Sequence, residues 1–181
     1  QLDPSQRRGP LPATPILAWF ASQFDQPWRQ FNQSVMLALP EQVDPDLLSA
    51  ALAAVTEAHE VFAIRVDPTA AAPYRIAETA EKPELRICRN SSETERMISD
   101  LQAALDPVVG RNVAALWLPQ ENHLLLTIHH LCVDVLSWDI LLQDLETAYE
   151  ALSAGQQPQI QPRGTPFRQW AMRLAQQSPT P

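Results

Sequence analysis

The stretch NVAALWLPQENHLLLTIHH, residues 112–130, contains two apolar runs, 112–119 and 123–130, joined by the polar residues Gln120, Glu121 and Asn122. Two runs of this length around a short polar turn predict a β-hairpin. Both runs are apolar at nearly every position, which indicates strands that are buried on both faces. The hairpin therefore predicts the centre of a sheet.

The segments around this hairpin alternate between the periods of helices and strands. Capping residues and helical spacing predict helices over residues 14–24, 44–60, 90–106, 135–152 and 165–176, and period-2 runs predict strands over 31–40, 62–66, 74–77 and 85–88. The sequence has no glycine-rich phosphate loop of the kind that nucleotide-binding folds place between a strand and a helix. We therefore expect an α/β protein, a two-layer α/β sandwich with a mixed sheet.

The composition narrows the possible partners and surroundings. The 181 residues are 45% hydrophobic, which is enough for one compact core, and the net charge of −8 argues against nucleic acid as a partner. Two cysteines are too few for a disulfide framework, so we expect a cytoplasmic protein. The chain lacks the roughly 18 consecutive apolar residues of a membrane span and begins without the apolar stretch of a signal peptide, so we expect no membrane contact and no export by that route.

Proline-rich polar stretches stand at both ends of the chain. They predict linkers over residues 1–10 and 178–181, which leaves one folded lobe over 11–177.

Two adjacent histidines, His129 and His130, end the second apolar run, and Asp134, Ser137 and Trp138 follow at the start of a predicted helix. Neighbouring residues of a strand point to opposite faces, so one imidazole should face the core and the other should face away from it. Asp134 is close enough in sequence to turn back toward an imidazole or a nearby arginine. This arrangement suits one positioned base beside a cleft.

Three other interpretations of the histidine pair stay open. Both imidazoles could simply be satisfied core groups. A metal site would need further ligands, and His59 and His123 do not have ligand-type spacing to the pair. Cys132 and a histidine could form a nucleophilic pair, although the sequence shows no Asn or Asp to orient the histidine and no oxyanion loop.

The run from His129 to Trp138 resembles the HHxxxD signature of the condensation-domain superfamily of nonribosomal peptide synthetases. The order Ser137-Trp138 is similar to the epimerization branch, since members that form peptide bonds tend to have Trp-Ser there. Four further segments also resemble that branch, namely 11–20, 31–40, 57–65 and 167–175. The resemblance covers nearly the whole chain from residue 11. It implies a chloramphenicol-acetyltransferase-like lobe, the N-terminal half of a domain in which two such lobes enclose a tunnel.

The resemblance also implies roles. His130 is similar to the catalytic acid/base at the α-carbon of an aminoacyl or peptidyl thioester, His129 to a structural histidine, and Asp134 to an acid that braces the loop by pairing with an arginine, with Ser137 and Trp138 supporting the motif. The substrate would be carried on the phosphopantetheine arm of a peptidyl carrier protein, and the lobe itself would bind no cofactor and no metal.

The partners that the resemblance implies are the carrier protein and a C-terminal lobe, which in the family provides a glutamate for the opposite face of the substrate. An unpaired lobe should expose an apolar face, so a homodimer is also expected to be possible. Arginines are candidates for the carrier contact, namely Arg7, Arg8, Arg163 and Arg168.

Three positions depart from the family pattern. Val135 replaces the usual glycine after the aspartate, Leu17 replaces a glutamine of the opening helix, and Ala63 replaces an arginine. Val135 and Ala63 favour one alternative to epimerization, a non-catalytic lobe that docks carrier proteins or serves as a structural module. A peptide-bond-forming condensation lobe is a further alternative, and the order Ser137-Trp138 speaks against it.

Overall fold

The computed structural model describes residues 7–25, 28–161 and 164–177, and a four-stranded sheet forms its centre. The strand order is β2 (Asn32–Ala38), β7 (His123–His129), β6 (Val113–Leu118), β5 (Leu85–Ile87). β2, β7 and β6 are antiparallel, whereas β5 runs parallel to β6. The predicted hairpin is therefore confirmed as the two central strands, and the sheet is mixed as expected.

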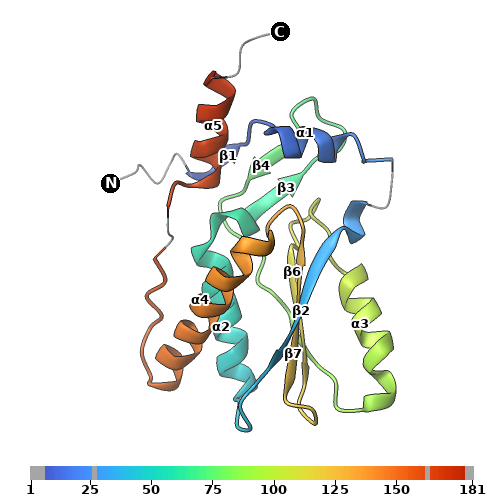
Figure 1. Ribbon diagram of the computed structural model, residues 1–181, viewed down its shortest axis with the longest axis vertical. Coiled ribbons are helices and arrows are strands. Elements are labelled where there is room, and N and C mark those ends of the chain that lie inside the picture. Colours follow the sequence, from blue (N-terminus) through green and yellow to red (C-terminus); the bar gives the residue numbers. More distant parts are fainter. Residues whose placement is uncertain (1–6, 26–27, 162–163, 178–181) are drawn as a thin grey trace.

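Helices cover both faces of this sheet (Figure 1). α2 (Pro45–Ala58) and α4 (Val135–Ser153) lie against one face, where Leu124, Leu126 and Ile128 of β7 join the main core. α3 (Thr94–Ala103) lies against the other face and forms a second core with β6. The predicted α/β sandwich is thus confirmed, and α3 adds a third layer because the central strands are apolar on both faces.

Local sequence explains where the helices begin. Asp44 precedes α2, and its carboxylate accepts hydrogen bonds from the backbone amides of Asp46 and Leu47 at 2.8 and 3.2 Å. Thr14 caps α1 (Pro15–Ala21) in the same way. Proline occupies the first helical position in both, where its missing amide hydrogen has no partner to lose.

A smaller sheet lies beyond one end of the first, with the order β1 (Gly9–Pro10), β4 (Tyr74–Ile76), β3 (Ile64–Val66). β1 pairs with β4, so Gly9 and Pro10 belong to the folded lobe and not to the predicted linker. Of the predicted linker residues, 1–6 and 178–181 lie outside the described residues, whereas 7 and 8 are described. A 3-10 helix, Glu60–Ala63, replaces the first part of the strand predicted over 62–66.

Asn112 ties the two sheets together. It is buried directly before β6, and its Nδ2 donates to the carbonyl oxygens of Phe62 and Ile64 at 2.9 and 2.8 Å. The end of the large sheet that carries the histidines is thereby fixed against the small sheet.

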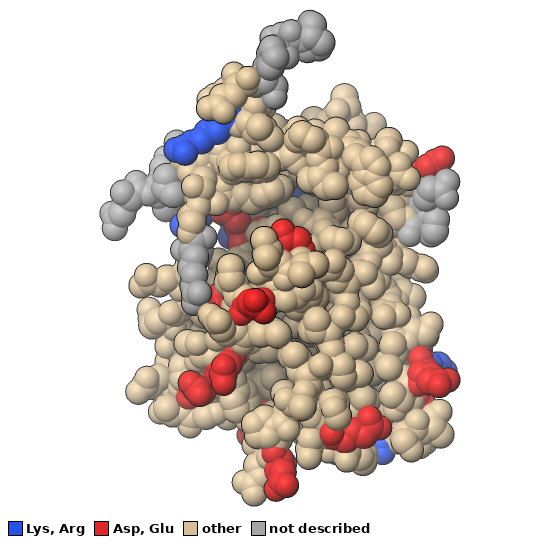
Figure 2. Space-filling model, in the orientation of Figure 1, with Lys and Arg blue, Asp and Glu red and all other residues tan. Residues whose placement is uncertain are grey.

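The last helix, α5 (Phe167–Gln177), lies beside β1, where the Nε of Arg168 donates to the carbonyl oxygen of Pro10 at 2.8 Å. In Figure 2, acidic side chains are spread over the lower part of the visible face, whereas a small basic patch lies at the upper left. Among the described residues, no helix combines the length and the apolar character that crossing a bilayer requires.

Candidate functional site

His129 is fully buried and held by backbone groups. Its Nε2 lies 3.0 Å from the carbonyl oxygen of Trp28, and its Nδ1 accepts from the backbone amide of Leu131 at 3.2 Å. Burial lowers the pKa of this imidazole to about 4. A neutral ring with both nitrogens occupied by backbone groups is suited to a structural role.

His130 points the other way, as the strand geometry predicts, and is partly exposed. Its Nδ1 lies 2.8 Å from the carbonyl oxygen of Val133, and its Nε2 lies 3.1 Å from the side-chain amide nitrogen of Gln33. The ring stacks on Phe31 with 4.8 Å between the centroids. These contacts fix both the plane of the imidazole and its rotation.

A cavity of about 310 Å³ opens beside His130. Its lining is largely apolar and comes from α1, the residue before β2, the 3-10 helix, the loop between β7 and α4, the first turn of α4 and the first residue of α5. The residues are Ile16, Leu17, Trp19, Phe20, Phe31, Val61, His130, Leu131, Cys132, Val133, Asp134, Ser137 and Phe167. One imidazole in a largely apolar pocket is the arrangement expected of a single positioned base.

Asp134 caps α4. Its Oδ1 accepts from the backbone amide and from the hydroxyl of Ser137, at 2.8 and 2.6 Å, and these hydrogen bonds, the hydroxyl's foremost, lower the pKa of the carboxyl group. Among the described residues no arginine forms an ion pair with Asp134, and Arg65 pairs instead with Glu81 at 3.6 Å. The expected arginine pairing is therefore corrected: this carboxylate braces the loop by capping the helix.

Trp138 is buried one residue further along α4, and its Nε1 donates to Oε1 of Gln33 at 3.0 Å. Gln33 was missing from the predicted site. Its signal in the sequence was the alternation of β2, which places this amide on the same inward face as Val35 and Leu37. A polar side chain on an inward face needs a partner, and here it has two.

The three departures from the family pattern lie in different surroundings. Val135 is 76% exposed at the start of α4 and does not line the cavity beside His130. Leu17 and Ala63 are buried in the main core. The structure therefore shows no crowding of this cavity by Val135.

Cys132 lines the same cavity. Its thiol donates to the carbonyl oxygen of Val61 at 3.3 Å, and burial raises its pKa. A protonated, buried thiol is a poor nucleophile. In the parts of the chain that the structure describes, no three His, Cys, Asp or Glu side chains gather as metal ligands would.

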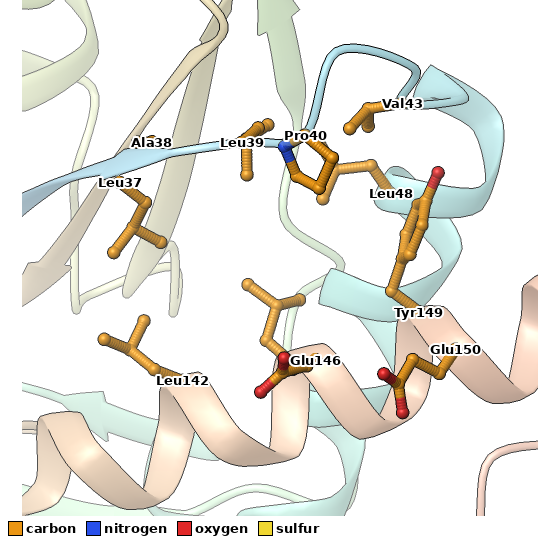
Figure 3. A pocket seen from close by; sticks show the side chains of 11 residues that line it. Leu37, Ala38, Leu39, Pro40, Val43, Leu48, Leu142, Glu146, Tyr149 and Glu150 are labelled. Atoms are coloured by element: carbon orange, nitrogen blue, oxygen red, sulfur yellow. The ribbon is translucent and has the colours of Figure 1, made fainter.

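A second cavity, of about 460 Å³, lies between the end of β2, α2 and α4 (Figure 3). Leucine, proline and valine side chains form most of its wall, and Glu146, Tyr149 and Glu150 reach it from α4. Among the described residues that line it there is no histidine, cysteine or serine. Of these two cavities, the smaller one beside His130 is therefore the one that contains an imidazole.

Comparisons with known proteins agree with this geometry. Residues 8–180 match the family model described as "Condensation domain". The chain is 39% identical over 179 residues to one of the subunits of linear gramicidin synthase from Brevibacillus parabrevis, and 30% identical over 185 residues to surfactin synthase subunit 1 of Bacillus subtilis (strain 168). These alignments cover 92% and 96% of the chain, but only 3% and 5% of those much longer proteins.

Among solved structures, the epimerization domain from the third module of tyrocidine synthetase B superposes with a TM-score of 0.81 at 27% identity, over 93% of this chain and 41% of that one. The first condensation domain of the calcium-dependent antibiotic synthetase shares the fold, with a TM-score of 0.70 at 21% identity over 93% of this chain and 43% of that one. The chain thus belongs to the condensation domain family, within the superfamily of condensation and epimerization domains of nonribosomal peptide synthetases.

Proposed function

We propose that this chain is the N-terminal lobe of an epimerization domain, in which His130 moves the α-proton of an aminoacyl or peptidyl thioester carried by a peptidyl carrier protein. The observation that carries the proposal is the placement of His130, a held imidazole that lines an apolar cavity. The likeness to the tyrocidine epimerization domain and the order Ser137-Trp138 support the branch.

Removal of the α-proton requires an unprotonated base whose nitrogen is held in a fixed orientation toward the substrate. A thioester carbonyl acidifies the adjacent carbon, so an imidazole nitrogen can remove its proton and leave an enolate-like group. Return of a proton to the other face inverts the centre. His130 offers Nε2 for the first step, because its Nδ1 is bound to the carbonyl oxygen of Val133.

The second step requires a group on the opposite face, which in related domains is a glutamate of the C-terminal lobe. Large apolar side chains near the cavity are exposed, as a surface for another lobe would be: Ile16, Trp19, Phe31, Val135 and Leu136. A C-terminal lobe is the proposed occupant of this surface, and a second copy of the chain is the alternative when that lobe is absent.

The carrier protein would bring the substrate on its own phosphopantetheine arm, so the lobe needs no cofactor. Of the arginines expected to contact a carrier, Arg8 donates to the carbonyl oxygen of Ala77 at 3.1 Å and Arg168 to that of Pro10. Both therefore lie near β1 and β4, and Arg163 lies outside the described residues. These two arginines support a carrier contact on that side of the lobe.

The proposal is tested by deuterium uptake. The chain is mixed in heavy water with a C-terminal lobe of an epimerization domain and a carrier protein loaded with an aminoacyl-pantetheine thioester, and mass spectrometry follows the α-carbon. His130→Ala should abolish uptake, whereas His123→Ala, at the other end of β7, should leave it unchanged. Uptake that survives His130→Ala would show that another residue is the base.

The same mixture separates the alternatives when an acceptor aminoacyl thioester is added. A dipeptide product without deuterium uptake would identify a condensation lobe. Neither product nor uptake, from a lobe that still binds the loaded carrier, would identify a docking module.

A further inference from the structure

Gln33 links the two aromatic side chains of the site into one chain of hydrogen bonds. Nε1 of Trp138 lies 3.0 Å from Oε1 of Gln33, and Nε2 of Gln33 lies 3.1 Å from Nε2 of His130. On its other side, the imidazole meets the carbonyl oxygen of Val133 at 2.8 Å. The chain runs from α4 through β2 to the loop after β7.

The chemistry of the two ends fixes the position of every proton in this chain. An indole nitrogen can only donate, so the amide of Gln33 presents its oxygen to Trp138 and its NH₂ group to His130. Nε2 of His130 must therefore accept. At the other end a carbonyl oxygen can only accept, so Nδ1 carries the proton. Both ends independently specify the same neutral tautomer.

We propose that Gln33 is a positioning residue: anchored by Trp138, it covers the reactive Nε2 of His130 and holds this nitrogen unprotonated until the amide is displaced. The inference rests on the proposed function in one respect, that the proton taken by Nε2 comes from a thioester substrate. The covering of Nε2 by Gln33 and the tautomer of His130 follow from the hydrogen bonds alone.

A proton on Nε2 would conflict with this arrangement. The ring N–H would then face the NH₂ group of Gln33, and both are donors. Turning the amide over would satisfy His130 but would set the NH₂ group against the indole N–H of Trp138, which is a second pair of donors. Trp138 is only 8% exposed, so water has little access to relieve that conflict. Gln33 and Trp138 together therefore favour the neutral base and the release of any proton that it takes.

Carbethoxylation of the ligand-free chain with diethyl pyrocarbonate tests the covering of Nε2, because this reagent attacks unprotonated imidazole nitrogens. Peptide mass spectrometry gives a rate for each histidine, and His123 in the same molecule serves as the internal reference. Gln33→Ala should raise the rate at His130 about fivefold, the factor that corresponds to one ordinary hydrogen bond. Trp138→Phe, which removes only the anchor of the amide, should give a smaller rise.

Gln102→Ala is the matched control, since this amide on α3 bonds to the hydroxyl of Ser34 and does not bond to His130. It should leave the rate at His130 unchanged. Equal rates at His130 in the wild-type chain and in Gln33→Ala would overturn the proposal.

Nitrogen-15 NMR of histidine-labelled chain tests the tautomer itself. The wild-type spectrum should show His130 protonated on Nδ1 alone. Gln33→Glu places acceptor oxygens between two donors, so both nitrogens of His130 should then carry protons at neutral pH. Unchanged His129 signals, from the neighbouring buried ring, report that the variant is folded.

A wild-type His130 protonated on Nε2 would also overturn the proposal. Neither measurement contains substrate, so a negative result in the thioester assay and a negative result here are independent.

Discussion

Asp134 and Ser137 form a closed hydrogen-bonded cap at the start of α4, in which one carboxylate oxygen accepts both the backbone amide and the hydroxyl of Ser137 at 2.8 and 2.6 Å. The cap fixes the turn between the end of β7 and α4, and that turn also carries the carbonyl oxygen of Val133 that holds His130. The aspartate of the motif therefore acts on the site through the helix that it begins.

Removal of this cap should cost stability. Asp134→Ala should lower the free energy of unfolding by about 1 kcal/mol, the usual cost of losing a side-chain N-cap. Asp134→Asn keeps an oxygen that can accept from Ser137 and should restore most of the loss. Urea unfolding of the three proteins measures both effects. A loss in Asp134→Asn as large as that in Asp134→Ala would mean that the negative charge, not the cap, is what matters.

Asn112 should be among the most sensitive positions outside the cavity. Asn112→Ala leaves the carbonyl oxygens of Phe62 and Ile64 buried without their donor, which should cost about 2–4 kcal/mol. Asn112→Asp should cost more, because a carboxylate cannot donate to either oxygen and would itself be buried. Thermal and urea unfolding report the loss.

The matched control for Asn112 is Asn122→Gly. Asn122 lies in the turn between β6 and β7 with φ of 51°, a conformation that glycine adopts without strain. It should stay within about 0.5 kcal/mol of the wild-type chain. A loss at Asn112 no larger than that of the control would contradict the bridging role.

Hydrophobic pattern and capping residues were sufficient to predict the central strands and to predict that each of the longer helical segments is a helix. The apolar character of β6 and β7 on both faces contained the information that helices cover both sides, although a run of apolar residues does not say which helix supplies the second layer. The pairing of Gly9 and Pro10 with β4 was not predictable, because a dipeptide has no periodicity and its partner lies more than sixty residues away in the sequence.

The site shows the same division. Strand alternation was enough to predict that His129 and His130 face opposite ways. The partners of His130 could not be predicted in the same manner, because Gln33 comes from a strand 97 residues away and Val133 contributes a backbone oxygen, which no residue type reveals.

Cys132 should behave as a buried structural thiol. In the folded chain its reaction with a disulfide reagent such as DTNB should be at least about tenfold slower than in urea, because burial keeps the thiol protonated. Cys132→Ser keeps a hydroxyl that can donate to Val61 and should leave the deuterium uptake proposed for His130 intact. Rapid labelling of Cys132 in the folded chain, together with loss of uptake in Cys132→Ser, would instead revive a cysteine nucleophile.

The buried His129 should make stability depend on pH in a defined window. The folded chain lowers the pKa of His129 to about 4, whereas the same side chain in the unfolded chain titrates near 6.5. Between these values the unfolded chain binds more protons than the folded one, so the stability contribution is fully present above pH 6.5 and is lost as the pH falls toward 4. The difference corresponds to about 3 kcal/mol, at 1.36 kcal/mol per pKa unit.

His129→Gln isolates this contribution, since glutamine has an N–H that can donate to the carbonyl oxygen of Trp28 and has no charge at any pH. Its free energy of unfolding, measured by urea titration from pH 7.5 to 4, should fall much less steeply than that of the wild-type chain over this window. Asp67 and Asp134 do not contribute to the difference in pH dependence between the two proteins. Their pKa values lie below the ordinary carboxyl range, and both proteins contain them. Parallel curves for the two proteins would show that His129 is not the group whose protonation unfolds the lobe.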